Sequence, residues 1–210
     1  MTSRPTTPAQ AWAELAAGNQ RFVHGRPEHP NQDAQHRDQL VGGQNPFAAF
    51  FGCGDSRVAA EVIFDQGLGD LFVVRTAGHV MDPSVLGSLE FGVAVLNIPL
   101  IAVLGHDSCG AVKATISAVE HGKMPSGFLR DIVERVVPSV LAARNIGPTT
   151  PEAVEAVHVK ETIQLMHERS AVIAAGVADG SLGLIGLTYA LADGRAHIVH
   201  TVGDVGVDAY

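Results

Sequence analysis

The chain has 210 residues, of which 46% are hydrophobic and 17% are charged, a composition typical of a globular protein. Fourteen lysines and arginines stand against 22 aspartates and glutamates, so the net charge is −8. Nucleic-acid binders ordinarily carry a basic excess, so neither nucleic acid nor a membrane surface is expected as a partner. The two cysteines are too few for a disulfide framework, and without a recognisable secretory leader we expect reduced thiols and a cytoplasmic location.

The most apolar stretch, residues 91–105, is too short and too interrupted for a membrane span. It is about fifteen residues long and contains Asn97 and Pro99, whereas a spanning helix needs about twenty apolar residues. The sequence shows no internal repeat and no low-complexity segment. Residues 1–210 are therefore predicted to form a single domain that begins with an N-terminal arm, residues 1–40.

The arm opens with an amphipathic helix. Thr7 followed by Pro8 is typical of a helix start, and apolar residues recur at helical spacing as far as Gly25. The polar segment that follows, with Asp33 and His36, is expected to be flexible.

Beyond the arm, short apolar runs alternate with helical patterns. Strands are predicted at residues 47–51, 71–75, 100–104 and 181–189, and helices at 58–65, 83–96, 111–121, 128–143 and 152–175. A turn at Asp193-Gly194 leads into a last strand, residues 196–202, expected to be antiparallel at the edge of the sheet. This order predicts an α/β fold with a mainly parallel sheet, whose ligands should bind where strands end, after residues 51 and 104.

Both cysteines lie in these two loops. Cys53 follows the first strand, and His106 and Cys109 follow the third. Two thiolates and an imidazole are ligands that suit zinc. Three protein ligands with a fourth position open are typical of a catalytic zinc site, whereas four protein ligands are typical of a structural one.

Asp55 is the candidate for the fourth position. It could bind zinc and close the site, or it could pair with Arg57 and leave a water on the metal, and the spacing allows either. Asp107 and Ser108 are expected to cap the helix that follows. His79 could be a proton shuttle, but we expect it to be a solvated loop residue.

The pattern Cys53-x-Asp55-x-Arg57 with His106-x-x-Cys109-Gly110 resembles the β-class carbonic anhydrases. The resemblance implies one zinc ion per chain bound by both cysteines and the histidine, and an Asp55-Arg57 dyad beside it. It implies four parallel strands in the order 2-1-3-4 with an antiparallel edge strand. It also implies a homodimer or homotetramer in which residues 1–40 pack on the partner.

The same resemblance suggests a substrate pocket. Gln44 matches a glutamine that hydrogen-bonds the substrate, and Phe72 matches an aromatic residue that lines the pocket across the dimer. Phe91 stands where the family has a tyrosine, so the hydroxyl of that tyrosine is missing here. The backbone N–H near Gly110 is a further candidate to bind the developing oxygen charge.

The predicted function is the reversible hydration of CO₂ to bicarbonate and a proton through a zinc-bound hydroxide. The Asp55-Arg57 spacing further predicts a pH switch, in which Asp55 moves onto zinc at low pH and closes the site. Two alternatives remain open from the sequence. One is a CS₂ or COS hydrolase with the same ligands, and the other is a non-catalytic, zinc-stabilised dimeric module.

Overall fold

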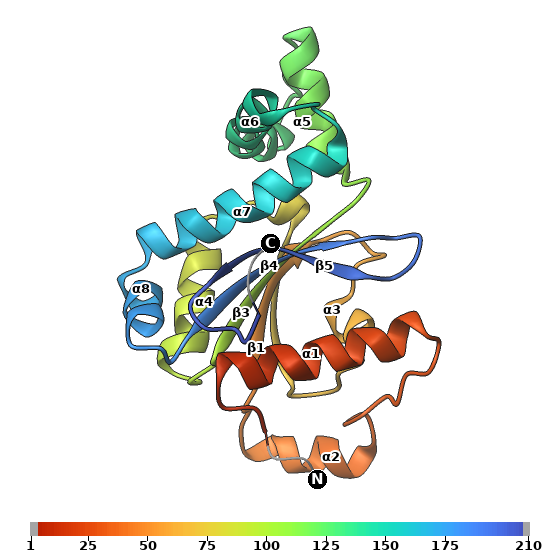
Figure 1. The fold of residues 1–210 in the computed structure, drawn as a ribbon, viewed down its shortest axis with the longest axis vertical. Coiled ribbons are helices and arrows are strands. Elements are labelled where there is room, and N and C mark those ends of the chain that lie inside the picture. The colour runs from red at the N-terminus through yellow and green to blue at the C-terminus, as the bar shows by residue number, and fades with distance from the viewer. Residues whose placement is uncertain (1–3, 208–210) are drawn as a thin grey trace.

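A five-stranded sheet runs through the centre of the molecule (Figure 1). The computed structural model describes residues 4–207. Its strands are β1 (Ala48–Cys53), β2 (Leu71–Thr76), β3 (Leu100–His106), β4 (Gly183–Tyr189) and β5 (Ala196–Val202). Their order is β2-β1-β3-β4-β5, and every pairing is parallel except that of β4 with β5. The predicted order and the antiparallel edge strand are both confirmed.

Helices cover both faces of this sheet (Figure 1). They are α1 (Pro8–Val23), α2 (Ala34–Gln39), α3 (Ala60–Ile63), α4 (Pro83–Ala94), α5 (Gly110–His121), α6 (Leu129–Ile146), α7 (Pro151–Arg169) and α8 (Ala171–Ala178), with short 3-10 turns at Leu40–Gly42 and Ala77–His79. Strands β1 and β3 are buried along their whole length, so both faces need apolar side chains. This explains why the sequence there is continuously apolar instead of alternating.

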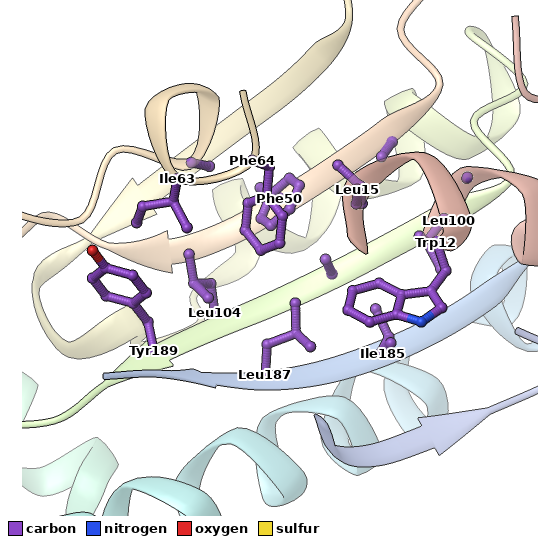
Figure 2. Close-up of a cluster of buried hydrophobic side chains, with 14 of the residues drawn as sticks. Trp12, Leu15, Phe50, Ile63, Phe64, Leu100, Leu104, Ile185, Leu187 and Tyr189 are labelled. Atoms are coloured by element: carbon purple, nitrogen blue, oxygen red, sulfur yellow. The ribbon is translucent and has the colours of Figure 1, made fainter. Parts of the chain in front are cut away.

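The first core lies between the sheet and α1 with α3 (Figure 2). Trp12 and Leu15 of α1 meet Phe50 of β1 there, and the Phe50 ring packs at 4.9 Å from the ring of Phe64. Thr7 caps α1 by accepting a hydrogen bond from the Gln10 N–H, as predicted. The amphipathic face of α1 thus packs within its own chain, and the packing of residues 1–40 on a partner stays a prediction.

The opposite face carries a second core, and a third surrounds the ends of β1 and β3. Side chains of α4, α7 and α8 cover the second face. In the third, Cys53 and Cys109 pack with apolar residues of α5, α6 and α7, among them Val112, Val136 and Val154. Helices α5 and α6 extend beyond the sheet (Figure 1), and apolar residues of both helices belong to the same cluster as the two cysteines.

Two predicted segments differ from the structure. The single helix predicted over residues 152–175 is wrong, because Ser170 adopts an extended conformation and its side chain accepts a hydrogen bond from the Ile173 N–H, which starts α8 as a separate helix. The segment predicted to be flexible contains α2 instead, capped by the Asp33 carboxylate. In each case a single polar residue, Ser170 or Asp33, sets where a helix begins. The spacing of apolar residues does not reveal such a cap. None of the helices within residues 4–207 is long and apolar enough to cross a membrane.

The buried carboxylate of Asp65 fastens the arm to the domain. Asp65 is 2% exposed and accepts hydrogen bonds from the Glu28 N–H at 2.9 Å, the His29 N–H at 2.9 Å and Arg21 Nε at 2.5 Å. Burial opposes its ionisation, but these donors together hold its pKa below the ordinary value. The ionised form therefore stabilises the fold above the unfolded pKa of about 3.9, and this contribution is lost as the pH falls through the folded pKa.

We predict that Asp65→Asn lowers the free energy of unfolding at pH 7 by about 1–3 kcal/mol, because buried donors lose a charged acceptor. The difference from wild type should shrink near pH 3, where the carboxyl is protonated in the unfolded chain. Urea denaturation at both pH values measures this. Asp38→Asn, at an exposed carboxylate of the same arm, is the control and should change little; equal losses in both variants would contradict the role of Asp65.

Candidate metal centre

Strand topology brings three metal-binding side chains together. β1 ends at Cys53 and β3 ends at His106, and the two strands are parallel neighbours in the sheet. Cys109 follows three residues after His106 and precedes the first residue of α5. The donor atoms of Cys53, His106 and Cys109 all lie within 4.8 Å of one another, and all three residues are buried. Two loops some fifty residues apart in the chain thus form one cluster.

The donor set fits a metal ion. His106 Nδ1 donates a hydrogen bond to the Asp107 carbonyl at 2.7 Å, which leaves the lone pair on Nε2. That nitrogen is buried without a hydrogen-bond partner, and buried polar atoms ordinarily have one. Two sulfurs bound 2.3 Å from a tetrahedral ion lie about 3.8 Å apart, so a small adjustment of the side chains suffices for coordination.

The two thiols affect each other's ionisation. The neighbouring Cys109 thiol is the main cause that lowers the pKa of Cys53, and the same contact together with burial raises the pKa of Cys109. Ionisation of Cys53 thus opposes ionisation of Cys109. A metal cation stabilises both thiolates at once, because coordination deprotonates a thiol.

Asp55 and Arg57 form a two-point ion pair beside the cluster. Arg57 Nε donates to Asp55 Oδ1 at 2.9 Å and Arg57 Nη2 to Oδ2 at 2.7 Å, and the Arg57 N–H also donates to Oδ1. This pairing holds the pKa of Asp55 well below its usual range. Asp55 Oδ2 lies 3.9 Å from His106 Nε2. The carboxylate thus borders the donor atoms while the arginine occupies both of its oxygens.

Several residues that hold this site had not been predicted from the sequence. Arg75, at the end of β2, donates to the carbonyls of Cys53 at 2.8 Å and Asp55 at 2.5 Å. The Gly78 N–H donates to Cys53 Sγ at 3.3 Å, and Glu155 accepts the His106 N–H at 3.0 Å. The only sign in the sequence that Arg75 supports the site is its charge at the end of a predicted strand. Gly78 and Glu155 bind residues that are 25 and 49 positions away in the chain, so the sequence gives no sign of their contacts.

The predictions for the neighbouring loop residues are wrong. His79 is not solvated but has no exposed surface, and burial holds its pKa well below the ordinary value, so the ring is neutral. Cys109 occupies the capping position of α5 without a side-chain hydrogen bond. Asp107 instead accepts the Leu191 N–H at 3.1 Å, because the turn directs it toward the loop after β4.

The predicted pocket residues lie apart from the donor cluster within one chain, except Gly110, which begins α5 next to Cys109. Gln44 is exposed in the loop before β1. Phe72 lies on β2 four residues before Thr76, the partner of Cys53, which is about 13 Å along a strand. Its ring packs 6.3 Å from that of Phe91, which is 43% exposed. The pocket roles of these residues stay predictions.

The arrangement as a whole is that of a metal-binding α/β enzyme. Its donor set lies at the carboxyl ends of two neighbouring parallel strands, β1 and β3, which is where such folds bind their ligands. The strand order reverses between β1 and β3, because β2 lies on the other side of β1 and β4 on the other side of β3. The Asp55-Arg57 dyad beside the donors adds a carboxylate that can act on a bound molecule.

Comparison with known proteins identifies the family. The carbonic anhydrase family model matches residues 48–196. Carbonic anhydrase 2 of Mycobacterium tuberculosis is 56% identical over 201 residues, which cover 96% of this chain and 97% of that protein. Among solved structures, the β-carbonic anhydrase of Coccomyxa in complex with acetazolamide has a TM-score of 0.70 at 25% identity and covers 91% of this chain and 83% of its own. A structure from a report on two tetrameric β-carbonic anhydrases of Sordaria macrospora has a TM-score of 0.71 at 19% identity. The match covers 91% of this chain and 98% of the Sordaria chain, and it supports the fold.

The chain belongs to the β-class carbonic anhydrase family. It is accordingly a lyase that hydrates CO₂. The resemblance seen in the sequence motifs is confirmed.

We predict that Cys53→Ser and Cys109→Ser each abolish tight binding of one zinc ion per chain, because a serine hydroxyl does not replace a thiolate ligand. Chelator-competition titration of metal-free protein with zinc measures this. Ser108→Ala, which removes a hydroxyl from the same loop, is the control and should bind as wild type does. Stoichiometric tight binding by either serine variant would contradict the assignment.

Proposed function

We propose that Cys53, His106 and Cys109 hold one zinc ion per chain and that this centre carries out the hydration of CO₂. The observation that supports the proposal is the buried His106 Nε2, which has no hydrogen-bond partner and lies within 4.8 Å of two thiol sulfurs. Bound zinc would supply a Lewis acid that lowers the pKa of a water molecule.

Asp55 and Arg57 are proposed to orient the reacting water. Two thiolates and a neutral imidazole cancel the charge of the ion, so water is acidified less than at a cationic site. A carboxylate that accepts a hydrogen bond from the water compensates for this. Arg57 keeps that carboxylate ionised and directs it, since it binds both oxygens.

The substrate pocket is proposed to be completed by a second copy of the chain. Gln44, Phe72 and Phe91 lie apart from the donors of their own chain, and β2 is an edge of the sheet. The exposed ring of Phe91 beside Phe72 supports contact with a partner in a homodimer or homotetramer, with residues 1–40 reaching the partner. In each site, Gln44 and the N–H near Gly110 would receive oxygen charge while the aromatic residues line the side of the pocket.

The proposed location is a reducing compartment such as the cytoplasm. Cys53 and Cys109 are both free thiols with donor atoms within reach of each other. Oxidation of either would remove a metal ligand.

Stopped-flow hydration of CO₂, with zinc content measured on the same sample, tests the proposed centre. About one zinc per chain with rapid turnover at alkaline pH is expected. Zinc without turnover would favour the non-catalytic dimeric module. Turnover of COS or CS₂ in the absence of CO₂ hydration would favour the hydrolase.

A pH switch is proposed for Asp55. Because Arg57 lowers the pKa of Asp55, the carboxylate stays ionised in acid and remains able to bind a metal when hydroxide becomes scarce. Activity should therefore fall as the pH decreases from about 8.5 to about 6, because Asp55 replaces the hydroxide as the hydroxide is protonated. A constant rate over this interval would contradict the switch.

Arg57→Ala should release Asp55 toward the metal and lower the rate of CO₂ hydration by about 10-fold or more, as loss of a residue that holds an active-site group commonly does. Stopped-flow assays at alkaline pH measure the effect. Arg37→Ala is the control, since Arg37 is an exposed arginine whose partner Asp38 is also its neighbour in the sequence. Full activity of Arg57→Ala would contradict the proposed orientation of Asp55.

A further inference from the structure

One helix contacts the end of β3, which carries His106, and the turn after β2, which binds Cys53. Glu155 and His158 lie three residues apart on α7 (Pro151–Arg169), a spacing that places them on one face of the helix. They are 1% and 5% exposed. Polar side chains buried to this extent destabilise a fold unless they are hydrogen-bonded, so their partners indicate what they do.

Glu155 holds the backbone of His106. Its Oε1 accepts the His106 N–H at 3.0 Å. The approach requires a glycine at position 105, because a Cβ there would lie 2.5 Å from Oε1. Burial raises the pKa of Glu155 to about 7, and its neighbour His79, 3.5 Å away, is neutral. An apolar residue at position 155 would avoid the free-energy cost of burying a carboxyl group, but it could not accept a hydrogen bond from the His106 N–H.

His158 holds the turn that binds Cys53. Its Nε2–H donates to the Gly78 carbonyl at 3.0 Å, and its Nδ1 lies 2.9 Å from the hydroxyl oxygen of Ser139. Gly78 has a left-handed φ of 63°, a conformation that glycine adopts readily. In this conformation the Gly78 N–H donates to Cys53 Sγ at 3.3 Å. The hydrogen bonds thus run from α7 through Gly78 to the sulfur.

His79 fills the space between the two contacts. Its ring lies 4.3 Å from that of His158 and 3.5 Å from the Glu155 carboxylate. Helix α7 therefore faces both the end of β3 and the Gly78 turn across a packed layer, and a shift of either away from the helix would break a buried hydrogen bond.

We propose that Glu155 and His158 are positioning residues that hold His106 and Cys53 in the geometry that binds the metal. Neither touches the reacting molecules. Glu155 acts through the backbone N–H of His106 itself. His158 acts through Gly78, in the turn after β2, whose N–H binds Cys53 Sγ. Together they fix the end of β3 and this turn relative to each other. The proposal rests on the metal centre proposed above.

Two variants at position 155 separate hydrogen bonding from charge. Glu155→Gln keeps an oxygen at the position that accepts the His106 N–H and removes the charge. Glu155→Asp keeps the charge but is one methylene shorter, which takes the carboxylate out of hydrogen-bond range. We expect Glu155→Asp to bind zinc about 10- to 100-fold more weakly than wild type, and Glu155→Gln to stay close to wild type.

A second pair tests position 158. His158→Leu removes the donor to the Gly78 carbonyl, whereas His158→Gln retains an N–H donor. We expect weaker zinc binding in the first, again by about 10- to 100-fold, and recovery of most of the affinity in the second. Thr162→Val, one turn further along α7 and buried, is the matched control and should behave as wild type.

Zinc affinity by chelator competition and the absorption spectrum of the cobalt-substituted protein are the readouts. Displacement of Cys53 should weaken the thiolate-to-cobalt charge-transfer band, which a loss of global stability alone would not do while the protein remains folded by circular dichroism. If His158→Leu does not fold, the Glu155 pair and His158→Gln still decide the question.

The outcomes distinguish this proposal from the metal centre itself. Failure of the wild-type protein to bind zinc would overturn the centre. Zinc binding and cobalt spectra like wild type in Glu155→Asp and His158→Leu would overturn the positioning role alone. Weak binding by Glu155→Gln with tight binding by Glu155→Asp would show that charge matters and would also overturn it.

Discussion

The parallel pairing of β1 with β3 is the constraint on which the rest of the site depends. In this register Gly52 lies opposite Leu104, so Cys53 and His106 leave the sheet at the same edge. Parallel neighbours deliver their carboxyl ends together, and the intervening chain has to cross over to β2 and return. The candidate metal ligands converge because of sheet topology. A different strand order would separate the same motifs by the width of a strand or more.

Burial of charge around this edge shapes the surrounding structure. The two thiols, Asp55 and Glu155 place negative charge in a small volume. Arg57 and Arg75 approach from the exposed side and bind carboxylate and carbonyl oxygens, and a metal ion would balance the thiolates. Binding of a metal ion here would therefore contribute to the stability of the fold at this edge. Helix α7 contributes Glu155 from the buried side. A cationic side chain would be costly to bury there, so the His106 backbone N–H is the donor to this carboxyl group instead.

Much of the architecture could be read from apolar periodicity. The buried strands β1 and β3 are continuous apolar runs, and Thr7-Pro8 marks the start of α1 because capping chemistry is local. Apolar periodicity did not reveal the break between α7 and α8 at Ser170, nor the helix α2 that Asp33 caps. Each depends on the hydrogen bond of one polar side chain. The prediction that His79 is solvated is wrong because α7 covers this loop and leaves the side chain with no exposed surface.

The residue types in the sequence are enough to predict the chemistry of the site: two thiols, an imidazole and an Asp-Arg pair follow two predicted strands, and these side chains suit zinc and a carboxylate beside it. Tertiary structure alone decided how these groups are held. Glu155 and His158 lie at least 49 residues from the amide and carbonyl that they bind, and hydrogen bonds to backbone atoms leave no pattern in side-chain types. Only the packing of α7 against the sheet reveals them.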